Sequence, residues 1–252
     1  MNYQRVDLAT WERGDLFRYY MEQMRIVTGM TVDICVTPLV TYAKKHDLRF
    51  YPCMLWVVSS VINAHAEFKY GWNEAGELIR WQAVSPSHVF FHGEDERFTK
   101  LVTPYHEDIL VFHKQVLADE LRHCNDRGIL PDQPKNAFDV SALPWVHYRQ
   151  LDMHVFDAGK HLAPVVTWGR YSEENGEQVL PLSMQIHHAV ADGFHLSRFF
   201  VEVQRMIDQL ESKDDQNRNR VRPEASEKEA SQKTEVSVEK AAEKDGFSAL
   251  DR

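Results

Sequence analysis

The residues with the clearest chemical potential lie in one stretch, PLSMQIHHAVADGFHLSRFF, which runs from Pro181 to Phe200. Two adjacent histidines, His187 and His188, stand where an alternating pattern ends, and Asp192 and Gly193 follow shortly after. An imidazole has an unperturbed pKa of about 6.5, so a positioned histidine can accept a proton from a substrate at neutral pH. The alternatives are a metal ligand in a His-x-x-x-Asp pair and a histidine that simply belongs to the core.

The alternation before the histidines predicts a strand with one apolar and one polar face, because successive side chains point to opposite sides. The apolar face carries Leu182, Met184 and Ile186, and the polar face carries Ser183, Gln185 and His187. Continued by one position, the period places His188 on the apolar side. Burial disfavours the charged imidazole and lowers its pKa, which suits a proton acceptor. Asp192 is expected to cap the following helix or to pair with a buried arginine, and either contact would fix the backbone of His188.

A metal site would need a third ligand from elsewhere in the chain. The eleven histidines that remain of the 13 in the sequence show no metal-ligand spacing. We therefore predict no metal site. A core histidine with satisfied polar atoms stays open at this point, since the local pattern alone does not distinguish it from a base.

The chain around this stretch predicts a mixture of helices and strands. Helical patterns occur at residues 15–24, 40–47, 54–68, 109–123 and 194–210. Strand patterns occur at 30–38, 87–92, 145–156, 163–171 and 179–188, and residues 69–84 read as a hairpin whose turn is Asn-Glu-Ala-Gly. Because no regular βαβ order and no internal repeat are present, we predict an α+β fold, a mixed β-sheet layered with helices.

Composition excludes several classes of partner. The net charge is −9 and the basic residues are scattered, which argues against nucleic acid. No apolar run approaches the roughly 18 residues of a membrane span, and the polar N-terminal segment does not resemble a signal peptide. The three cysteines, Cys35, Cys53 and Cys124, are too widely separated for a disulfide framework, so we expect a reducing cytoplasm.

Composition also divides the chain. Residues 1–211 have an ordinary globular composition that is rich in aromatic side chains. Residues 212–252 are almost devoid of apolar side chains, carry mixed charges and show no hydrophobic period. Such a segment cannot bury enough surface to offset its ordering entropy, so we predict a disordered tail or a frayed helical one.

Beyond these patterns, HHAVADGFHLSRFF resembles the active-site signature of the chloramphenicol O-acetyltransferases, His-His-Ala-Val-x-Asp-Gly-Phe-His. The segments SALPWV, RFYPCM and MNYQRVDLATWERGDLFRYY resemble further blocks of that family, in the same order and with comparable spacing. A more distant resemblance is to the catalytic domain of dihydrolipoyl acyltransferases, which share the shorter His-x-x-x-Asp-Gly. The resemblance implies the chloramphenicol acetyltransferase-like, CoA-dependent acyltransferase fold, with residues 1–211 as one acetyltransferase domain.

The resemblance also implies a homotrimer with active sites at the subunit interfaces. It identifies His188 as the general base that takes a proton from an acceptor hydroxyl, in a ternary complex with acetyl-CoA. Ser141 matches the serine that donates to the tetrahedral oxyanion, and Thr167 matches a threonine that supports it through water. Asp192 and Arg13 match a buried ion pair that shapes the turn and shuttles no proton.

Ligand-binding positions follow from the same resemblance. The positions implied for the co-substrate acetyl-CoA are Arg49, Tyr51, Trp145, Arg170 and Tyr171, and no bound cofactor is expected. The positions implied for the acceptor are Tyr19, Tyr20 and Phe98. The segment RIVTGMT at residues 25–31 departs from the family pattern at the acceptor site, where a cysteine and an aromatic residue are common.

Three functions are compatible with this sequence. The first is transfer of an acetyl group from acetyl-CoA to chloramphenicol, which would inactivate the antibiotic. The second keeps the chemistry and changes the acceptor to another hydroxylated small molecule. The third is a non-catalytic trimeric binding protein, which the intact set His188, Ser141, Thr167, Asp192 and Arg13 disfavours, because a binding protein has no use for it.

Removing residues 212–252 is expected to leave both the melting temperature and the activity nearly unchanged, because the segment has no apolar face to dock. Thermal unfolding and steady-state kinetics of the truncated and full-length chains test this. A fall of more than a few degrees would show that the tail packs against the rest of the protein.

Overall fold

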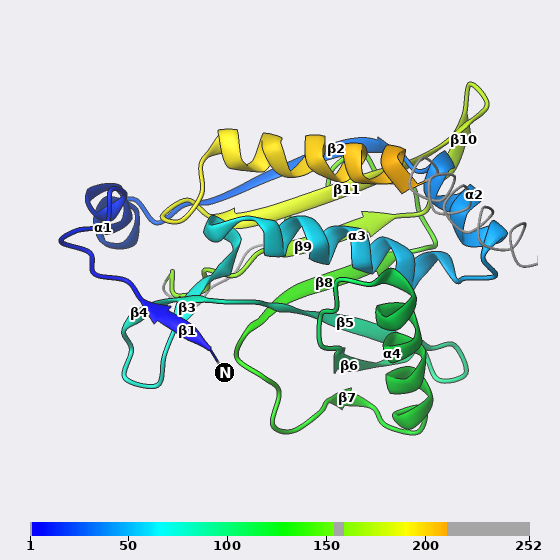
Figure 1. Ribbon diagram of the computed structural model, residues 1–252, viewed down its shortest axis with the longest axis horizontal. Coiled ribbons are helices and arrows are strands. Elements are labelled where there is room, and N and C mark those ends of the chain that lie inside the picture. Colours follow the sequence, from blue (N-terminus) through cyan, green and yellow to red (C-terminus); the bar gives the residue numbers. More distant parts are fainter. Residues whose placement is uncertain (1, 154–158, 211–252) are drawn as a thin grey trace, which may run out of the picture. The chain divides into compact units, whose positions relative to one another are not determined.

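The computed structural model describes residues 2–153 and 159–210 (Figure 1). Contacts within the chain divide it into two units, Met1–Asp208 and Gln209–Arg252, and the first unit carries both sheets. The predicted tail, 212–252, lies outside the described residues.

The larger sheet has eight strands among the described residues. Seven follow the order β10-β11-β9-β8-β5-β6-β7, and β2 pairs with β11 off this path. Their bounds are β2 Val27–Cys35, β5 Ser85–His92, β6 Arg97–Val102, β7 Gly128–Ile129, β8 Ala137–Leu143, β9 Val165–Gly169, β10 Ser172–Glu174 and β11 Glu177–His187. β5 and β9 run parallel to β8, and β7 parallel to β6, while the other pairs are antiparallel. The predicted mixed sheet is confirmed.

A smaller sheet of three strands carries the predicted hairpin. Its order is β1-β4-β3, with β1 at Tyr3–Arg5, β3 at Tyr70–Trp72 and β4 at Leu78–Trp81. The Asn73 side chain closes the turn by accepting from the backbone N–H of Glu77 at 2.9 Å. Asn73 therefore supplies the local side-chain hydrogen bond for which asparagine is favoured in turns.

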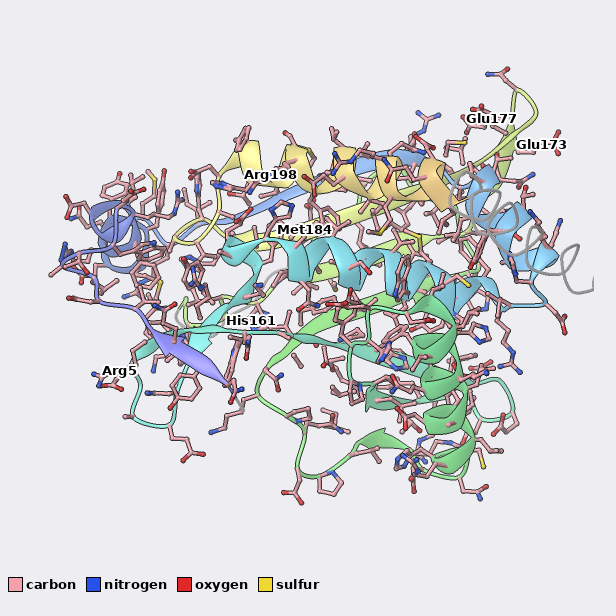
Figure 2. The ribbon with its side chains drawn as sticks, viewed as in Figure 1. Arg5, His161, Glu173, Glu177, Met184 and Arg198 are labelled. Atoms are coloured by element: carbon pink, nitrogen blue, oxygen red, sulfur yellow. The ribbon has the colours of Figure 1, made fainter. Side chains whose placement is uncertain are left out.

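The helices are α1 Gly14–Glu22, α2 Thr37–Lys45, α3 Phe50–Ala64 and α4 Ile109–Arg122, with a 3₁₀ turn, η1, at Ala66–Lys69. A C-terminal helix begins at residue 193 and is described through 210. It lies beside α3 along the strands of the larger sheet (Figure 1). Among the side chains of these elements, Arg198 on the C-terminal helix pairs with Glu67 in η1 (Figure 2).

The apolar face predicted for β11 forms the centre of the core. Leu182 and Met184 are fully buried and Ile186 is 1% exposed. The C-terminal helix buries its own apolar stripe, which consists of Leu196, Phe199, Phe200, Val203 and Ile207. Burial of these side chains stabilises the strand that ends at the two histidines.

Several predicted elements differ from the structure. The strand predicted at 145–156 is wrong: residues 145–153 form turns and irregular backbone, and 154–158 lie outside the described residues. Helix α2 starts at Thr37, earlier than predicted, because Pro38 sits in the first turn, where its missing N–H costs nothing. The helix predicted at 54–68 begins earlier, at Phe50, and ends at Ala64. Strands β6 and β8 were not predicted, although β8 alternates apolar and polar residues from Phe138 to Ser141.

No helix among the described residues combines the length and the apolar character needed to cross a membrane.

Candidate active site

The turn that follows β11 is held by one guanidinium group. Arg13 donates two hydrogen bonds to Asp192, from Nη1 to Oδ2 at 2.6 Å and from Nη2 to Oδ1 at 2.5 Å. It donates two more to backbone carbonyls, those of His188 at 2.8 Å and Ala189 at 2.7 Å. A planar fork of five donors suits such a bidentate arrangement. Arg13 therefore fixes both ends of the segment from His188 to Asp192.

The predicted ion pair between Arg13 and Asp192 is present, but in the described chain it is only partly buried. The Arg13 side chain is 14% exposed and that of Asp192 is 37% exposed. Among the described residues, the Asp192 carboxylate does not cap the last helix. The backbone carbonyl of Asp192 accepts from the N–H groups of His195 and Leu196, at 2.9 and 3.1 Å. Side chain and backbone of Asp192 thus act separately, one on Arg13 and one on the helix.

Arg13 reaches this turn because α1 begins directly after it. Gly14 allows the chain to pass close to the preceding loop, since a Cβ at this position would lie 2.2 Å from the carbonyl oxygen of Leu8. A larger residue would force the backbone apart at the position next to the arginine. Glycine is therefore required here for close approach.

His188 lies just beyond the end of β11, in the held turn. Its ring stacks on that of Tyr20 from α1, with centroids 4.1 Å apart and an interplanar angle of 8°. Its Nδ1 lies 3.2 Å from Asp192 Oδ1 without the alignment of a hydrogen bond, and no hydrogen-bond partner for this atom occurs among the described residues. Stacking on Tyr20 therefore holds the imidazole ring, and the held turn fixes the backbone that carries it.

The burial predicted for the two histidines is wrong. His187 is 2% exposed, whereas the side chain of His188 is 22% exposed. Both faces of β11 are covered, so the polar face is not a solvent face, and Ser183 and Gln185 on it are buried too. His187 Nδ1 accepts the N–H of Ala189 at 3.1 Å, which gives His187 a structural contact within the turn.

Ser141 and Thr167 are direct neighbours in the sheet. Ser141 on β8 pairs with Thr167 on β9, and Thr167 pairs in turn with Ser183 on β11. Directly paired residues point to the same face of a sheet, so the three hydroxyls share the polar face of β11. Thr167 is 2% exposed, and its Oγ1 has no hydrogen-bond partner among the described residues. This buried hydroxyl is available to a water or a ligand beside Ser141.

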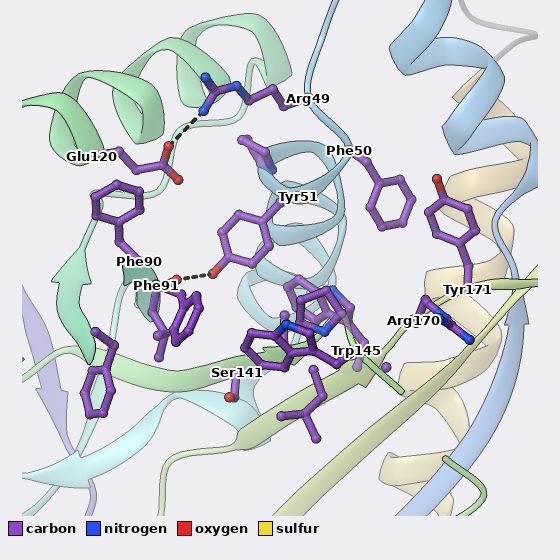
Figure 3. A pocket seen from close by; sticks show the side chains of 18 residues that line it. Arg49, Phe50, Tyr51, Phe90, Phe91, Glu120, Ser141, Trp145, Arg170 and Tyr171 are labelled. Atoms are coloured by element: carbon purple, nitrogen blue, oxygen red, sulfur yellow. Dashed lines mark hydrogen bonds and ion pairs between the residues drawn. The ribbon is translucent and has the colours of Figure 1, made fainter. Parts of the chain in front are cut away.

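Ser141 lines a cavity of about 890 Å³ (Figure 3). Its wall includes all five residues predicted to bind the coenzyme, which are Arg49, Tyr51, Trp145, Arg170 and Tyr171. Most of the remaining wall is aromatic or aliphatic. A large, mainly apolar cavity with a few charged groups is the usual form of a binding site for a small molecule.

The charged residues of the cavity wall are Arg49, Glu120 and Arg170. Arg49 immediately precedes α3 and its Nη1 donates to Glu120 Oε2 at 3.2 Å (Figure 3). Tyr51 lines the cavity, and its hydroxyl donates to the carbonyl of Val89 at 3.3 Å (Figure 3). Burial raises the pKa of Glu120, and the Arg49 charge opposes this change.

Other residues of the cavity wall were not predicted from the sequence. Phe91 packs its ring edge-on against Trp145 at 5.0 Å, and Phe50 packs against Tyr171 at 5.2 Å. Trp168 and Glu120 also line the cavity. Phe50 could have been predicted to line the cavity, because it lies between two predicted coenzyme positions. Phe91 and Glu120 are brought in by β5 and α4, which no local pattern connects to the site.

Within one chain the predicted residues form two separate groups. His188, Asp192, Arg13 and Tyr20 lie together at the end of β11, and Tyr19 packs on Tyr20 with ring centroids 5.2 Å apart. Ser141, the coenzyme positions and Phe98 line the cavity. His188 lies five residues along β11 from Ser183, which at about 3.3 Å per residue is about 17 Å. Each half of the predicted site is thus assembled within one chain, but the two halves lie apart.

Solved structures show which fold the chain has. One, titled chloramphenicol acetyltransferase, superposes with a TM-score of 0.72 at 20% identity, covering 82% of this chain and all of that chain. A probable dihydrolipoamide acetyltransferase from Listeria monocytogenes superposes with a TM-score of 0.56 at 12% identity, covering 82% of this chain and 95% of the other. Both likenesses establish the predicted CoA-dependent acyltransferase fold.

Sequence comparison identifies the family within that class. A family model described as chloramphenicol acetyltransferase matches residues 1–204. Chloramphenicol acetyltransferase of Streptomyces acrimycini is 36% identical over 80% of this chain and 93% of its own length. Those of Clostridium butyricum and Escherichia coli (type 3) are each 33% identical, over 82% of this chain and 95% and 97% of their own lengths. The chain belongs to the chloramphenicol acetyltransferase family, and it is an enzyme of the acyltransferase class.

Replacing Asp192 by Asn is expected to lower the free energy of unfolding at pH 7 by about 2 kcal/mol, because charged hydrogen bonds to Arg13 are lost. The hydrogen bond from Arg13 is the largest cause that holds the pKa of Asp192 below its ordinary value. A lowered folded-state pKa stabilises the protein above the unfolded pKa of about 3.9, and this contribution is lost as the pH falls through the folded value. The difference between wild type and Asp192→Asn should therefore shrink below about pH 4.

Urea unfolding of both proteins across this pH range measures the effect. Arg13→Lys is the matched change in the other partner of the ion pair, because it keeps the positive charge and removes the planar guanidinium. This variant should also be less stable than wild type at pH 7. Wild-type stability of Asp192→Asn together with lost turnover would mean that the carboxylate takes part in the chemistry and does not serve as a scaffold.

Proposed function

We propose that this protein transfers an acetyl group from acetyl-CoA to a hydroxyl of chloramphenicol. The observation that carries the proposal is the cavity of about 890 Å³ that is lined by Ser141 and by every predicted coenzyme position. Family membership supports the same activity. The predicted acceptor and coenzyme residues are assigned here as part of this proposal.

Acetyl-CoA fits the chemistry of the cavity. Arg49 and Arg170 line it, and guanidinium groups bind phosphate oxygens with directed hydrogen bonds. The Trp145 ring and the face of Tyr51 offer apolar contacts for the pantetheine chain and the adenine. The thioester carbonyl would then lie near Ser141. There the serine hydroxyl donates to the oxygen on which negative charge develops, and Thr167 supports it through a water.

His188 acts as the general base in this scheme. It removes the proton of the acceptor hydroxyl as the oxygen attacks the thioester carbonyl, and the tetrahedral intermediate then releases the coenzyme as a thiol. Stacking on Tyr20 and the four hydrogen bonds of Arg13 to the turn keep the imidazole in one orientation. A positioned base of this kind contributes about 10²–10⁴-fold to the rate.

The two halves of the site come together between subunits. Within one chain His188 and Ser141 lie about 17 Å apart along the strand direction and two strand spacings, or about 10 Å, across it. A ternary complex needs reacting atoms about 3 Å apart. A ring in which the His188 end of one subunit faces the cavity of the next closes three equivalent sites, as in a homotrimer.

The enzyme works in the cytoplasm in this proposal, because acetyl-CoA is available there. The free thiols of Cys35, Cys53 and Cys124 support a reducing compartment.

A second acceptor remains a candidate because of the segment beside the base. The backbone N–H of His188 donates to the carbonyl of Ile26 at 2.9 Å, and Val27 pairs with His187. RIVTGMT, the segment that departs from the family pattern, therefore runs directly alongside the base. The side chains of this segment would affect which acceptor fits beside the base, so another hydroxylated small molecule is the alternative substrate.

His188→Ala is expected to lower turnover by at least about 10²-fold, because the base is lost. His187→Ala should act mainly on stability, since His187 is buried and supports the turn through Ala189. Steady-state kinetics and thermal unfolding of both variants separate these effects. Equal losses of turnover in the two variants would contradict the assignment of the base.

The acceptor is tested by release of coenzyme A thiol from acetyl-CoA, with and without chloramphenicol. We expect chloramphenicol-dependent release, with a kcat lowered about 10²–10³-fold in Ser141→Ala and little change in KM. Phe98→Ala should raise KM for chloramphenicol by a factor of about 5–150, which corresponds to the roughly 1–3 kcal/mol of one buried apolar contact. No release above background with chloramphenicol, together with a serine effect on another alcohol, would overturn the acceptor and keep the acetyl transfer.

A further inference from the structure

A row of hydroxyl groups runs across the polar face of the sheet and has no part in the scheme above. The hydroxyls of Thr31 on β2 and Ser183 on β11 lie 2.8 Å apart. Ser183 Oγ lies 3.1 Å from the hydroxyl of Tyr148, which follows β8. Tyr148 in turn contacts the backbone carbonyl oxygen of Thr167 at 2.7 Å. The row thus ends at the threonine that neighbours Ser141.

The direction of each hydrogen bond in this row is fixed by its last acceptor. A carbonyl oxygen can only accept, so the single proton of Tyr148 goes to Thr167. Ser183 must then donate to Tyr148, and Thr31 must donate to Ser183. Burial raises the pKa of Tyr148, so the phenol stays protonated at neutral pH and keeps its role as donor.

We propose that Tyr148 is a positioning residue for the oxyanion-binding pair Ser141 and Thr167, an inference that rests on the proposed function. Its hydroxyl pins the backbone of Thr167 from the polar face. Because Thr167 is paired with Ser141 in the β8–β9 register, a displacement of Thr167 moves the serine hydroxyl as well. Errors of a fraction of an ångström matter at a group that stabilises developing charge.

The segment that carries Tyr148 has a second, independent anchor. The N–H of Arg170 donates to the carbonyl of Val146 at 2.7 Å. At Gly169 an added Cβ would lie 2.8 Å from that same carbonyl oxygen, so the segment and β9 are in close contact. Trp145, in the coenzyme cavity, is thus held without the Tyr148 hydroxyl. Removing that hydroxyl should disturb the oxyanion pair and leave the coenzyme contacts in place.

The test is Tyr148→Phe, which removes one oxygen and keeps the ring. We expect kcat to fall about 3–10-fold, the value of one neutral hydrogen bond, while KM for acetyl-CoA changes less than about twofold. Tyr105→Phe is the matched control. The Tyr105 hydroxyl is also partly buried and donates to Ser60 Oγ at 3.2 Å, but Tyr105 does not line the cavity, so kcat should not change.

A double-mutant cycle with Ser141→Ala decides whether the effect passes through the serine. Without the serine hydroxyl there is nothing to position, so Tyr148→Phe should cause little further loss of kcat in that background. An unchanged kcat in Tyr148→Phe, or an equal loss with and without Ser141, would overturn the positioning role. If Ser141→Ala itself leaves kcat unchanged, the proposed oxyanion site fails, and the inference fails with it.

Discussion

The contact between Arg13 and the turn at residues 188–192 is the constraint on which the site depends. It joins residues 179 positions apart in the chain, so it forms only when α1 has docked against the end of β11. The guanidinium reaches two backbone carbonyls and a carboxylate in one plane, which fixes the path of the chain through the turn. The same docking brings Tyr20 of α1 onto the ring of His188. One helix therefore determines both the backbone and the ring of the proposed base.

The sheet provides the frame for the other half of the site. β11 lies next to the edge strand β2 and has β9 on its other side. Its register passes from Ser183 to Thr167 and on to Ser141, so the proposed oxyanion donor is positioned through two strand pairings. The helices cover the apolar face, and the hydroxyl row occupies the polar face. The sheet thus fixes the position of Ser141, whereas α1 fixes the position of His188.

The sequence predicted the strand at 179–188 and its division into faces, because Leu182, Met184 and Ile186 alternate cleanly with polar residues. It did not predict which histidine is buried, because β11 has both faces covered and His188 lies beyond the last paired residue. The strand predicted at 145–156 failed for a related reason. Its aromatic alternation, typical of a strand, reflects contacts of Trp145 with the cavity and of Tyr148 with β9, not pairing in a ladder.

The coenzyme positions came from the resemblance to a family and not from any local pattern. Arg49 and Tyr51 lie at the start of α3, and Arg170 and Tyr171 at the end of β9, which are far apart in sequence. Glu120, which pairs with Arg49, comes from a third element, α4. Only the three-dimensional fold brings these groups to one cavity.

The central claim is that His188 of one subunit works with Ser141 of another. Co-expressing His188→Ala and Ser141→Ala chains with different affinity tags and isolating the mixed trimers tests it directly. In either mixed composition one of the three interfaces keeps both native residues, so we predict about one third of wild-type turnover, well above either parent variant. Mixed trimers with no more activity than their parents would show that the two residues act within the same chain, or not together at all.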